Sequence, residues 1–457
     1  MFQVQPKQTP SLVEAIVLSL LLISMMSYFI IGLGTVPHIP ILLGIFLLIF
    51  YGLMKNISFT HLQGGMVEGA KAGMGAIFLF FLIGILISSW MVSGTIPVLI
   101  QTGFTLIGGQ WLYAIVFAIT AIIGISLGSS LTTTATIGVA FIGIAEAMDA
   151  SLAITAGAIV SGAFFGDKMS PLSDTTNLAS TIVNVDLFDH IKHISLTTIP
   201  AFILSFIGFL MLSPQDSVLS GAAADYQAAL ASTNLIHWSS WIPILVLVVC
   251  TLFKVPALIS IATSSLTATF LAIIRNGLSL TELGEIWFNG YTGTTDFEPV
   301  NQLLTKGGID SMLFTISLVL LALGFGGLLF KTGIIPSILK TFQHKLTSIR
   351  STILSTALTA IGINVMIGEQ YLSILLTGET FKGVYEKAGL AKKALSRTLE
   401  DAGTVINPLV PWSVCGVFIA DVLQVPVLSY LPFAFFCLLS PLITILFGAK
   451  TAPMKKR

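Results

Sequence analysis

Charged residues are scarce in this sequence. Only 9% of its 457 residues are Asp, Glu, Lys or Arg, whereas a soluble domain carries about 25%. Mean hydropathy is +0.96, and the formal charges balance to zero, so the chain offers no basic field for nucleic acid. These shortages exclude a soluble domain and a nucleic-acid-binding protein, and they predict a surface that faces lipid.

Cysteines and enzyme motifs are also sparse. The chain has three cysteines without CxxC spacing, which argues against a disulfide framework or a zinc site. The nucleotide-binding pattern GxxxxGK[ST] and the zinc pattern HExxH are absent. GISLG at 124–128 matches the GxSxG nucleophile pattern but lacks the strand–turn–helix context that this motif requires. We therefore expect no enzyme activity and no cofactor, and an energy source in ion gradients.

Long apolar runs are what the chain has in abundance. A helix needs about 20 apolar residues to cross the hydrocarbon core of a bilayer. Runs that meet or approach this length lie at 11–31, 38–54, 72–92, 110–126, 193–213, 238–253, 256–274, 309–330, 350–367 and 426–448. Two further segments, 127–190 and 369–424, are apolar but interrupted by polar residues, Pro and Gly. The sequence predicts an all-α polytopic membrane protein.

Lys and Arg near the span ends predict the orientation of the chain in the membrane. They gather in 331–350, in 382–397 and at the C-terminus, which we expect to be cytoplasmic. Segment 214–237 contains no Lys or Arg and is predicted to be external. Counting the spans back from this segment places the N-terminus in the cytoplasm as well.

The two halves of the chain resemble one another. SGTIPVLI at 93–100 resembles TGIIPSIL at 332–339, and TAIIGI at 120–125 resembles TAIGIN at 359–364, both at the same spacing along the chain. Chance similarity between apolar strings is the alternative. The charge rule places the segments that contain the first pair on opposite sides of the membrane, which favours an inverted repeat.

Inverted-topology repeats are a recurrent construction of secondary transporters, and their substrate site lies near the midplane between the repeats. We predict a first membrane repeat at 1–213, an external linker at 214–237 and a second membrane repeat at 238–457. The first spans of each repeat are candidates for a scaffold that pairs two copies into a homodimer.

Two polar segments interrupt the membrane region at corresponding positions of the halves. GDKMSPLSDTTN at 166–177 contains Pro171, which disfavours helix at the residue before it. We expect half-helices at 151–165 and 177–188 around an unwound loop. EDAGTVINPLVPWS at 400–413 is the counterpart. Paired interruptions of this kind are a strong sequence pointer to a transport site.

Each interruption is preceded by another polar stretch. SLGSSLTTTAT at 126–136 carries seven Ser and Thr hydroxyls, and its repeat partner is INVMIGEQ at 363–370. Hydroxylated residues often serve helix packing in membranes, which is the alternative for the threonines. For Ser129 and Ser130, beside Gly128, we expect the tip of a re-entrant hairpin that faces the site.

Carboxylates at membrane depth are costly and are functional by default. Asp167 and Asp174 flank the first interruption, and Glu400 and Asp401 open the second. A local ion pair with Lys168 is the alternative for Asp167, and helix N-capping is the alternative for Asp174. A hard cation such as Na⁺ takes carboxylate, carbonyl, hydroxyl and amide oxygens, all of which these segments supply. A buried carboxyl that holds either a proton or Na⁺ yields antiport by competition.

The motifs GDKMSPLSDTTNLAS at 166–180 and LEDAGTVINPLVPWS at 399–413 resemble the NhaC-type Na⁺/H⁺ antiporter family. The resemblance implies exchange of Na⁺ for H⁺ across the bacterial cytoplasmic membrane, and a fold of inverted repeats with discontinuous helices and re-entrant hairpins. Together with the hairpin and interruption patterns, it gives as candidate ion-binding residues Ser129, Ser130, Asp167, Ser173, Asp174, Thr175, Thr176, Asn177, Asn364, Glu369, Asp401 and Asn407. Na⁺ itself is predicted at Asp174, Asn177, Asp401 and Asn407.

The same family includes exchangers of organic anions such as malate and lactate, and an amino-acid transporter is also similar. An anion site favours Arg or Lys at membrane depth, and Lys168 is the clear candidate for that role. A single candidate of this kind favours Na⁺/H⁺ exchange, with Na⁺, H⁺ and the lipid bilayer as the partners.

Overall fold

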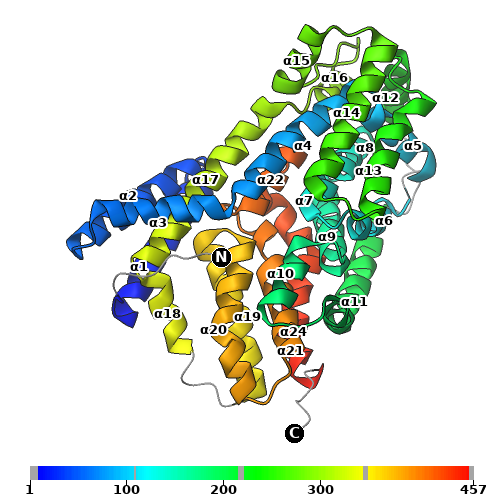
Figure 1. Cartoon of the computed structure of the whole chain (residues 1–457). Helices are drawn as coiled ribbons and strands as arrows, with labels where there is room; N and C mark the ends of the chain where they lie inside the picture. The colour runs from blue at the N-terminus through cyan, green and yellow to red at the C-terminus, as the bar shows by residue number, and fades with distance from the viewer. Residues whose placement is uncertain (1–8, 108–109, 215–220, 343–347, 452–457) are drawn as a thin grey trace.

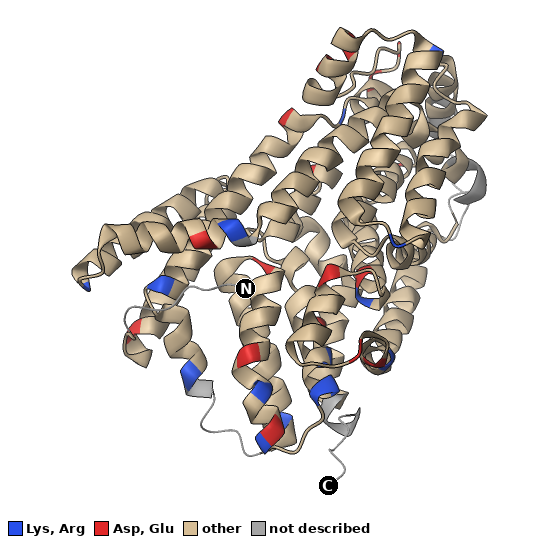
Figure 2. Cartoon of the chain, viewed as in Figure 1, with Lys and Arg blue, Asp and Glu red and all other residues tan. Residues whose placement is uncertain are grey.

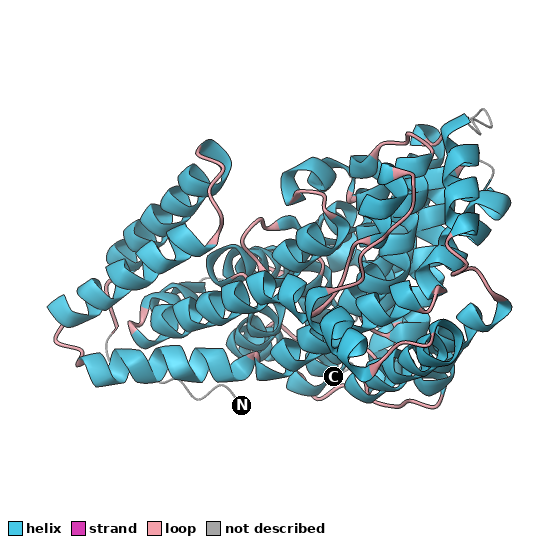
Figure 3. Cartoon of the chain, turned by 90° about the horizontal axis from the view of Figure 1, so that it is seen from above, coloured by secondary structure: helices cyan, strands magenta, loops and turns pink. Residues whose placement is uncertain are grey.

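The computed structural model describes residues 9–107, 110–214, 221–342 and 348–451. These residues form helices throughout, joined by short loops, and their only β-type pairing is one isolated bridge between Tyr291 and Lys306 (Figure 3). Because the bilayer interior offers no hydrogen-bond partners, a chain that spans it as helices satisfies its backbone groups internally. The predicted all-α class is confirmed.

The described residues from 9 to 214 contain eleven α-helices (Figure 1). Their bounds are α1 Leu12–Ser27, α2 His38–Met54, α3 Phe59–Ala72, α4 Met74–Val92, α5 Thr95–Ile107, α6 Leu112–Leu127, α7 Ser130–Thr133, α8 Val139–Ala147, α9 Leu152–Met169, α10 Asp174–Ile182 and α11 Leu187–Leu212. A π-helical turn, η2 Thr134–Gly138, joins α7 to α8 without a break. Helix α12, Gly221–Ser232, follows within the predicted external linker.

The second half begins after a 3₁₀ turn, η3 Trp238–Trp241. Its helices are α13 Ile242–Leu252, α14 Ala257–Asn276, α15 Leu280–Asn289, α16 Glu298–Leu304, α17 Ile309–Lys331, α18 Ile334–Phe342, α19 Ile349–Ile367, α20 Gln370–Lys387, α21 Lys392–Leu399, α22 Val414–Leu423, α23 Val427–Tyr430 and α24 Phe435–Thr451. A π-helical turn, η4 Glu400–Thr404, and a 3₁₀ turn, η5 Asn407–Leu409, lie between α21 and α22.

Eight helices of the described residues are long and apolar enough to cross a membrane, and two bent helix pairs raise this number to ten. The bent pairs are Lys392–Leu409 with Val414–Leu423, at 46°, and Val427–Phe433 with Phe435–Phe447, at 57°. The first of these bends falls at the end of the predicted interruption 400–413. The chain is therefore a multi-pass membrane protein with discontinuous helices.

Left-handed backbone turns recur at a constant spacing along the two halves. Gly128 and Gly368 end α6 and α19, with φ of +66° and +77°. The pairs Asp149 and Gly389, and Asn184 and Gln424, also have positive φ and are separated by the same length of chain. The structure thus repeats the helix order and turns, which supports the repeat, while its boundaries and inverted orientation stay predictions.

Helices α4 and α17 lie side by side and run antiparallel (Figure 1). Gly73, just before α4, lies against Leu323 in the second half of α17. Further along α4, the carbonyl of Gly84 accepts a hydrogen bond of 2.8 Å from the amide of Gly308, just before α17. These two helices occupy equivalent places in the two halves, so their opposed directions agree with the predicted inversion.

Helices α6 and α9 pack more closely than most pairs because glycines face one another across their contact. A Cβ atom at Gly166 would lie 2.5 Å from the backbone of Gly124. Small residues permit such close backbone approach between helices in membranes. This contact fixes the end of α9, where Asp167 and Lys168 follow directly after Gly166.

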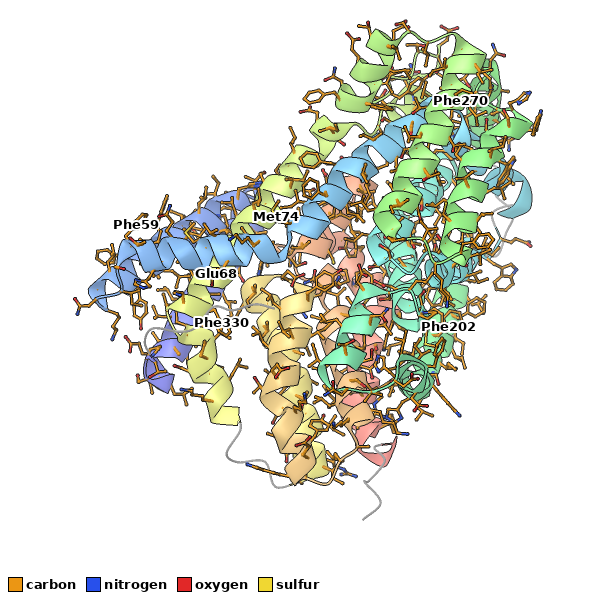
Figure 4. All side chains as sticks on the ribbon, in the orientation of Figure 1. Phe59, Glu68, Met74, Phe202, Phe270 and Phe330 are labelled. Atoms are coloured by element: carbon orange, nitrogen blue, oxygen red, sulfur yellow. The ribbon has the colours of Figure 1, made fainter. Side chains whose placement is uncertain are left out.

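Helix α3 lies across α17 and meets α4 at a bend beside Met74, with Phe59 at its far end and Glu68 along its length (Figure 4). Phe202 on α11 and Phe270 on α14 mark the other side of the molecule. Lys and Arg gather at the lower ends of α18, α20 and α21, while the middle of the molecule carries few charges (Figure 2).

Candidate functional site

The first hairpin tip is the turn between α6 and α7. Gly128 adopts the left-handed conformation that ends α6, and Ser129 is extended and caps α7 by accepting a 3.3 Å hydrogen bond from the amide of Thr132. Ser130, the first residue of α7, donates a 2.7 Å hydrogen bond to Asp167 Oδ2. The tip therefore places a hydroxyl directly on a buried carboxylate, while the ion-binding role of Ser129 and Ser130 stays a prediction.

The second hairpin tip is the turn between α19 and α20, and its backbone follows the same path. Gly368 ends α19 in the left-handed conformation, and Glu369 is extended and caps α20. Its carboxylate Oε2 accepts a 2.7 Å hydrogen bond from the amide of Leu372. Glu369 is 6% exposed. The second tip therefore has a buried carboxylate at the position where the first tip has the hydroxyl of Ser129.

The first interruption lies between α9 and α10. Ser170 is extended after α9, and Ser173 caps α10 by accepting a 3.3 Å hydrogen bond from the amide of Thr176. The side-chain amide of Asn177 donates to the carbonyls of Pro171, at 3.1 Å, and Ser173, at 2.7 Å. Asn177, in the first turns of α10, thus stabilises the unwound backbone that precedes this helix.

The predicted half-helix bounds 151–165 and 177–188 were wrong at both inner ends and at the outer end of the second half-helix. Helix α9 continues to Met169, and α10 begins at Asp174 because the hydroxyl of Ser173 supplies its cap. Helix α10 then stops at Ile182, since Asn184 is left-handed and Asp186 caps the next helix, α11. Ser173, and not Asp174, is therefore the N-cap of α10, and Asp174 is the first residue of this helix.

The second interruption is also followed by a serine-capped helix, but its polar side chains form hydrogen bonds within the protein. Ser413 caps α22 by accepting a 2.9 Å hydrogen bond from the amide of Gly416. Asn407 donates from Nδ2 to Asn364 Oδ1 at 2.8 Å and accepts at Oδ1 from the amide of Cys415 at 2.9 Å. Both atoms of its side-chain amide group are used within the protein, so Asn407 and Asn364 hold the interruption to α19.

A cavity of about 540 Å³ lies where the two hairpin tips meet the first interruption. Helices α7, α10, α20 and α22 all begin at its wall, in the middle of the molecule (Figure 1). Six of the predicted residues line it: Ser129, Ser130, Asp167, Asp174, Thr175 and Glu369. The other six do not, namely Ser173, Thr176, Asn177, Asn364, Asp401 and Asn407.

Two of the carboxylates that line the cavity are buried, and a third is exposed at its mouth. Asp167 is 4% exposed and Glu369 6%, whereas Asp174 is exposed, as is Lys254 on the same cavity. Among the described residues, no three His, Cys, Asp or Glu side chains come close enough to hold a metal ion together. A cation in this cavity would therefore combine a carboxylate with hydroxyl, amide, carbonyl or water oxygens, which suits a hard, weakly held ion.

Lys168 lies beside Asp167 in sequence but pairs with a different carboxylate. Its Nζ donates to Asp401 Oδ1, and both side chains are fully buried. The local Asp167–Lys168 ion pair that the sequence left open is therefore absent from the described contacts. Asp167 keeps its hydrogen bond to Ser130 and faces the cavity.

Comparison with known proteins identifies the family. The sequence model of the Na⁺/H⁺ antiporter family matches residues 162–450. The chain is 43% identical to the Na⁺/H⁺ antiporter NhaC of Alkalihalophilus pseudofirmus over 423 residues, 90% of each protein. The chain belongs to the NhaC-type Na⁺/H⁺ antiporter family.

Other relatives are similar over the same length. The chain is 39% identical to the NhaC antiporter of Bacillus subtilis, over 90% of this chain and 92% of that protein. It is 32% identical to the malate-2H⁺/Na⁺-lactate antiporter of Bacillus subtilis, over 96% of this chain and 94% of that protein. Family membership confirms the resemblance on which the sequence prediction rested, and these relatives are antiporters.

Most residues that line the cavity of this NhaC-type chain were not among the predicted ones, and three of these are Lys254, Tyr371 and Cys415. Cys415 follows Thr175 at the spacing that separates Gly128 from Gly368, so the repeat contained a signal for it. Tyr371 follows the polar pair Glu369–Gln370 at the second tip. Lys254 lies in the loop between α13 and α14, and nothing in its local sequence indicates that this loop reaches the cavity.

Proposed function

We propose that this chain exchanges Na⁺ for H⁺ across the bacterial cytoplasmic membrane by alternating access. The cavity at the two hairpin tips carries the proposal, because it brings Asp167, Glu369 and Asp174 to one space together with the hydroxyls of Ser129 and Ser130. Carboxylate and hydroxyl oxygens are the ligands that a hard cation takes. The similarity to NhaC antiporters supports Na⁺ and H⁺ as the exchanged ions.

Competition for the buried carboxylates couples the two ions. An uncompensated carboxylate at membrane depth costs several kcal/mol, and either a proton or Na⁺ removes that cost. Asp167 accepts a hydrogen bond from Ser130 at one oxygen and keeps other lone pairs for an ion. Binding of Na⁺ from one side then releases a proton, and rebinding of a proton on the other side releases Na⁺.

A second cavity, of about 400 Å³, supports access from the other side. Three helices line both cavities at different points along their length: α4 with Leu79 and Ile87, α17 with Leu323 and Asp310, and α22 with Cys415 and Asp421. Between these points the rings of Phe80 and Phe418 stack with centroids 4.9 Å apart, and both are fully buried. We propose that this aromatic pair is part of the barrier between the two cavities.

Accessibility of single cysteines tests this arrangement. Ser129→Cys lies on the first cavity and Gln302→Cys on the second, in a background where Cys250, Cys415 and Cys437 are replaced by Ser. We expect a membrane-impermeant maleimide to label Ser129→Cys from the cytoplasmic face and Gln302→Cys from the external face. Labelling of both from one face would contradict alternating access through these two cavities.

The cytoplasmic location of both termini and the homodimer remain part of the proposal. Lys and Arg gather at the ends of α18, α20 and α21 (Figure 2), and positive charge favours the cytoplasmic side. The antiparallel contact of α4 with α17 supports opposed repeats. Cross-linking in native membranes tests pairing through the first spans, and an exclusively monomeric protein would rule it out.

Exchange of an organic anion is the second candidate function. Several helix N-termini face the first cavity, among them those of α7, α10, α20 and α22, and helix N-termini favour anions. However, Lys168, the predicted anion partner, is bound to Asp401 and does not line the cavity. Lys254 lines the cavity and is exposed, and its single positive charge is outnumbered by three carboxylates on the same cavity. The balance of charge at the cavity favours a cation.

Transport by purified protein in liposomes tests the function. A proton gradient should collapse when Na⁺ is added, and Asp174→Asn should abolish this response. Asp296→Asn should preserve it, because Asp296 is exposed and lines neither cavity. A gradient that ignores Na⁺ but responds to malate or lactate would replace Na⁺/H⁺ exchange with the organic-anion function.

A further inference from the structure

The carboxylate of Asp401 is surrounded by donors from three other helices. Oδ1 accepts from Lys168 Nζ on α9 and from Ser440 Oγ on α24, the latter at 3.2 Å. Oδ2 accepts from Thr197 Oγ1 on α11, at 2.8 Å, and from Thr444 Oγ1 on α24. A carboxylate offers about four lone-pair sites, and four donors occupy them. Asp401 therefore has no free site for Na⁺.

Lys168 is held just as firmly. Its ammonium is fully buried, donates to Asp401 and to Ser440 Oγ at 2.9 Å, and lies 5.5 Å from the ring centre of Phe436. The carbonyl of Lys168 accepts a 3.2 Å hydrogen bond from Thr176 Oγ1 across the first interruption. The pair thus joins the end of α9, in the first half of the chain, to the start of η4 in the second half.

The last turn of α9 carries two neighbouring side chains of opposite charge, which lie in different surroundings. Asp167 lines the cavity and Lys168, the next residue, is bound to Asp401, which lies on neither cavity. An ammonium without its counter-ion at this position would stand directly beside the proposed Na⁺ ligand in the chain. It would repel a cation and compete for the carboxylate of Asp167.

We propose that Asp401 is the counter-ion of Lys168 and acts through it as a positioning residue, not as a ligand of Na⁺. It neutralises Lys168 and keeps the ammonium away from Asp167, which leaves Asp167 to the transported cation. This inference rests on the proposed Na⁺/H⁺ exchange and changes the role that the sequence predicted for Asp401.

A double-mutant cycle separates the two roles. We expect Asp401→Asn to raise the KM for Na⁺ about tenfold or more, because it strands a buried ammonium beside Asp167. Lys168→Met together with Asp401→Asn removes both charges and should return the KM to within about threefold of the wild type. Asp296→Asn is the control. If Asp401 were a Na⁺ ligand, the double variant would remain as poor as Asp401→Asn, which would overturn the proposal.

Stability measured in detergent gives a second readout that does not depend on transport. Each single variant should lower Tm more than the double variant does, because breaking a buried pair leaves an uncompensated charge. Additive losses would overturn the pairing. A wild-type protein that shows no Na⁺-dependent proton flux would refute the proposed function while leaving this stability result intact.

A milder variant keeps the proposal testable if the charge variants fail to fold. Ser440→Ala removes a hydroxyl that bonds both Lys168 and Asp401 but leaves both charges in place. We expect a lower Tm and a KM for Na⁺ within about twofold of the wild type, since the ion pair persists. A tenfold rise in KM would show that the Ser440–Asp401 cluster binds Na⁺ and would overturn the counter-ion role.

Discussion

The two interruptions, 166–177 and 400–413, share a backbone construction and differ in what they face. Ser173 and Ser413 are equivalent in the repeat and cap the helices that follow, and Ser170 and Val410 are extended at the same spacing. The first interruption presents carboxylates to the cavity, whereas the second turns its polar groups into the protein. The repeat thus supplies one backbone geometry, and substitutions within it decide that the first interruption presents its carboxylates to the cavity while the second does not.

Asp167 and Asn407 occupy equivalent positions of the two repeats, and they illustrate this difference. Asp167 accepts a hydrogen bond from Ser130 and lines the cavity. Asn407 uses both ends of its amide on Asn364 and Cys415. A carboxylate at this position leaves lone pairs for an ion, while an amide in a closed network does not.

Among the substitutions that compare equivalent positions of the repeat, Asp167→Asn should produce the largest loss. The substitution keeps the shape and the contact with Ser130 but removes the charge that either Na⁺ or a proton compensates. We expect Na⁺-dependent proton flux to fall roughly a hundredfold, equivalent to about 3 kcal/mol, with Tm nearly unchanged. Fluorescent ΔpH measurements in everted vesicles give the flux. Wild-type exchange in this variant would show that the cavity carboxylates are not the coupling groups.

Asn407→Ala should give the second largest effect, and on a different quantity. It leaves the amide of Cys415 and the Oδ1 of Asn364 without their partner, and each such buried group costs about 1–3 kcal/mol. We expect a clear fall in Tm in detergent, while the KM for Na⁺ of the folded fraction stays within about threefold of the wild type. An unchanged Tm with a greatly raised KM would place Asn407 in the ion site and erase the contrast between the interruptions.

Local features of the chain were predictable because short-range physics sets them. Apolar run length gave the spans, Pro171 and its polar neighbours gave the first interruption, and Gly128 with Ser129 gave a hairpin tip. The ends of the half-helices were missed because a cap at Ser173 and a left-handed Asn184 move them by several residues. These choices depend on single side chains within a uniform apolar composition.

Long-range partner choice could not be predicted from sequence alone. Lys168 has Asp167 beside it, yet it pairs with Asp401 in the other half of the chain because α9 and η4 meet only in the folded protein. For the same reason, the sequence placed Asp401 and Asn407 with the ion-binding residues. Spacing within the repeat identifies equivalent positions, but only packing decides which of the two equivalents reaches the cavity.

Ser130→Ala should give the smallest effect and sharpen the comparison at the hairpin tips. The hydroxyl of Ser130 donates to Asp167 Oδ2 at 2.7 Å, and its equivalent at the second tip is Gln370. Loss of one hydrogen bond to a charged group should raise the KM for Na⁺ about fivefold, close to 1 kcal/mol, with Vmax unchanged. Initial rates at a series of Na⁺ concentrations separate KM from Vmax.

Ser126→Ala is the matched control for this variant. Ser126 is half-buried on α6, does not line the cavity, and donates its hydroxyl to the carbonyl of Ile122 within the same helix. Its removal should leave both KM and Vmax at the wild-type values, because no ion contact depends on it. A fall in Vmax at constant KM in Ser130→Ala would mean that Ser130 contributes to the conformational change and not to ion binding. The two tips would then differ in their part in that change and not in how they contact the ion.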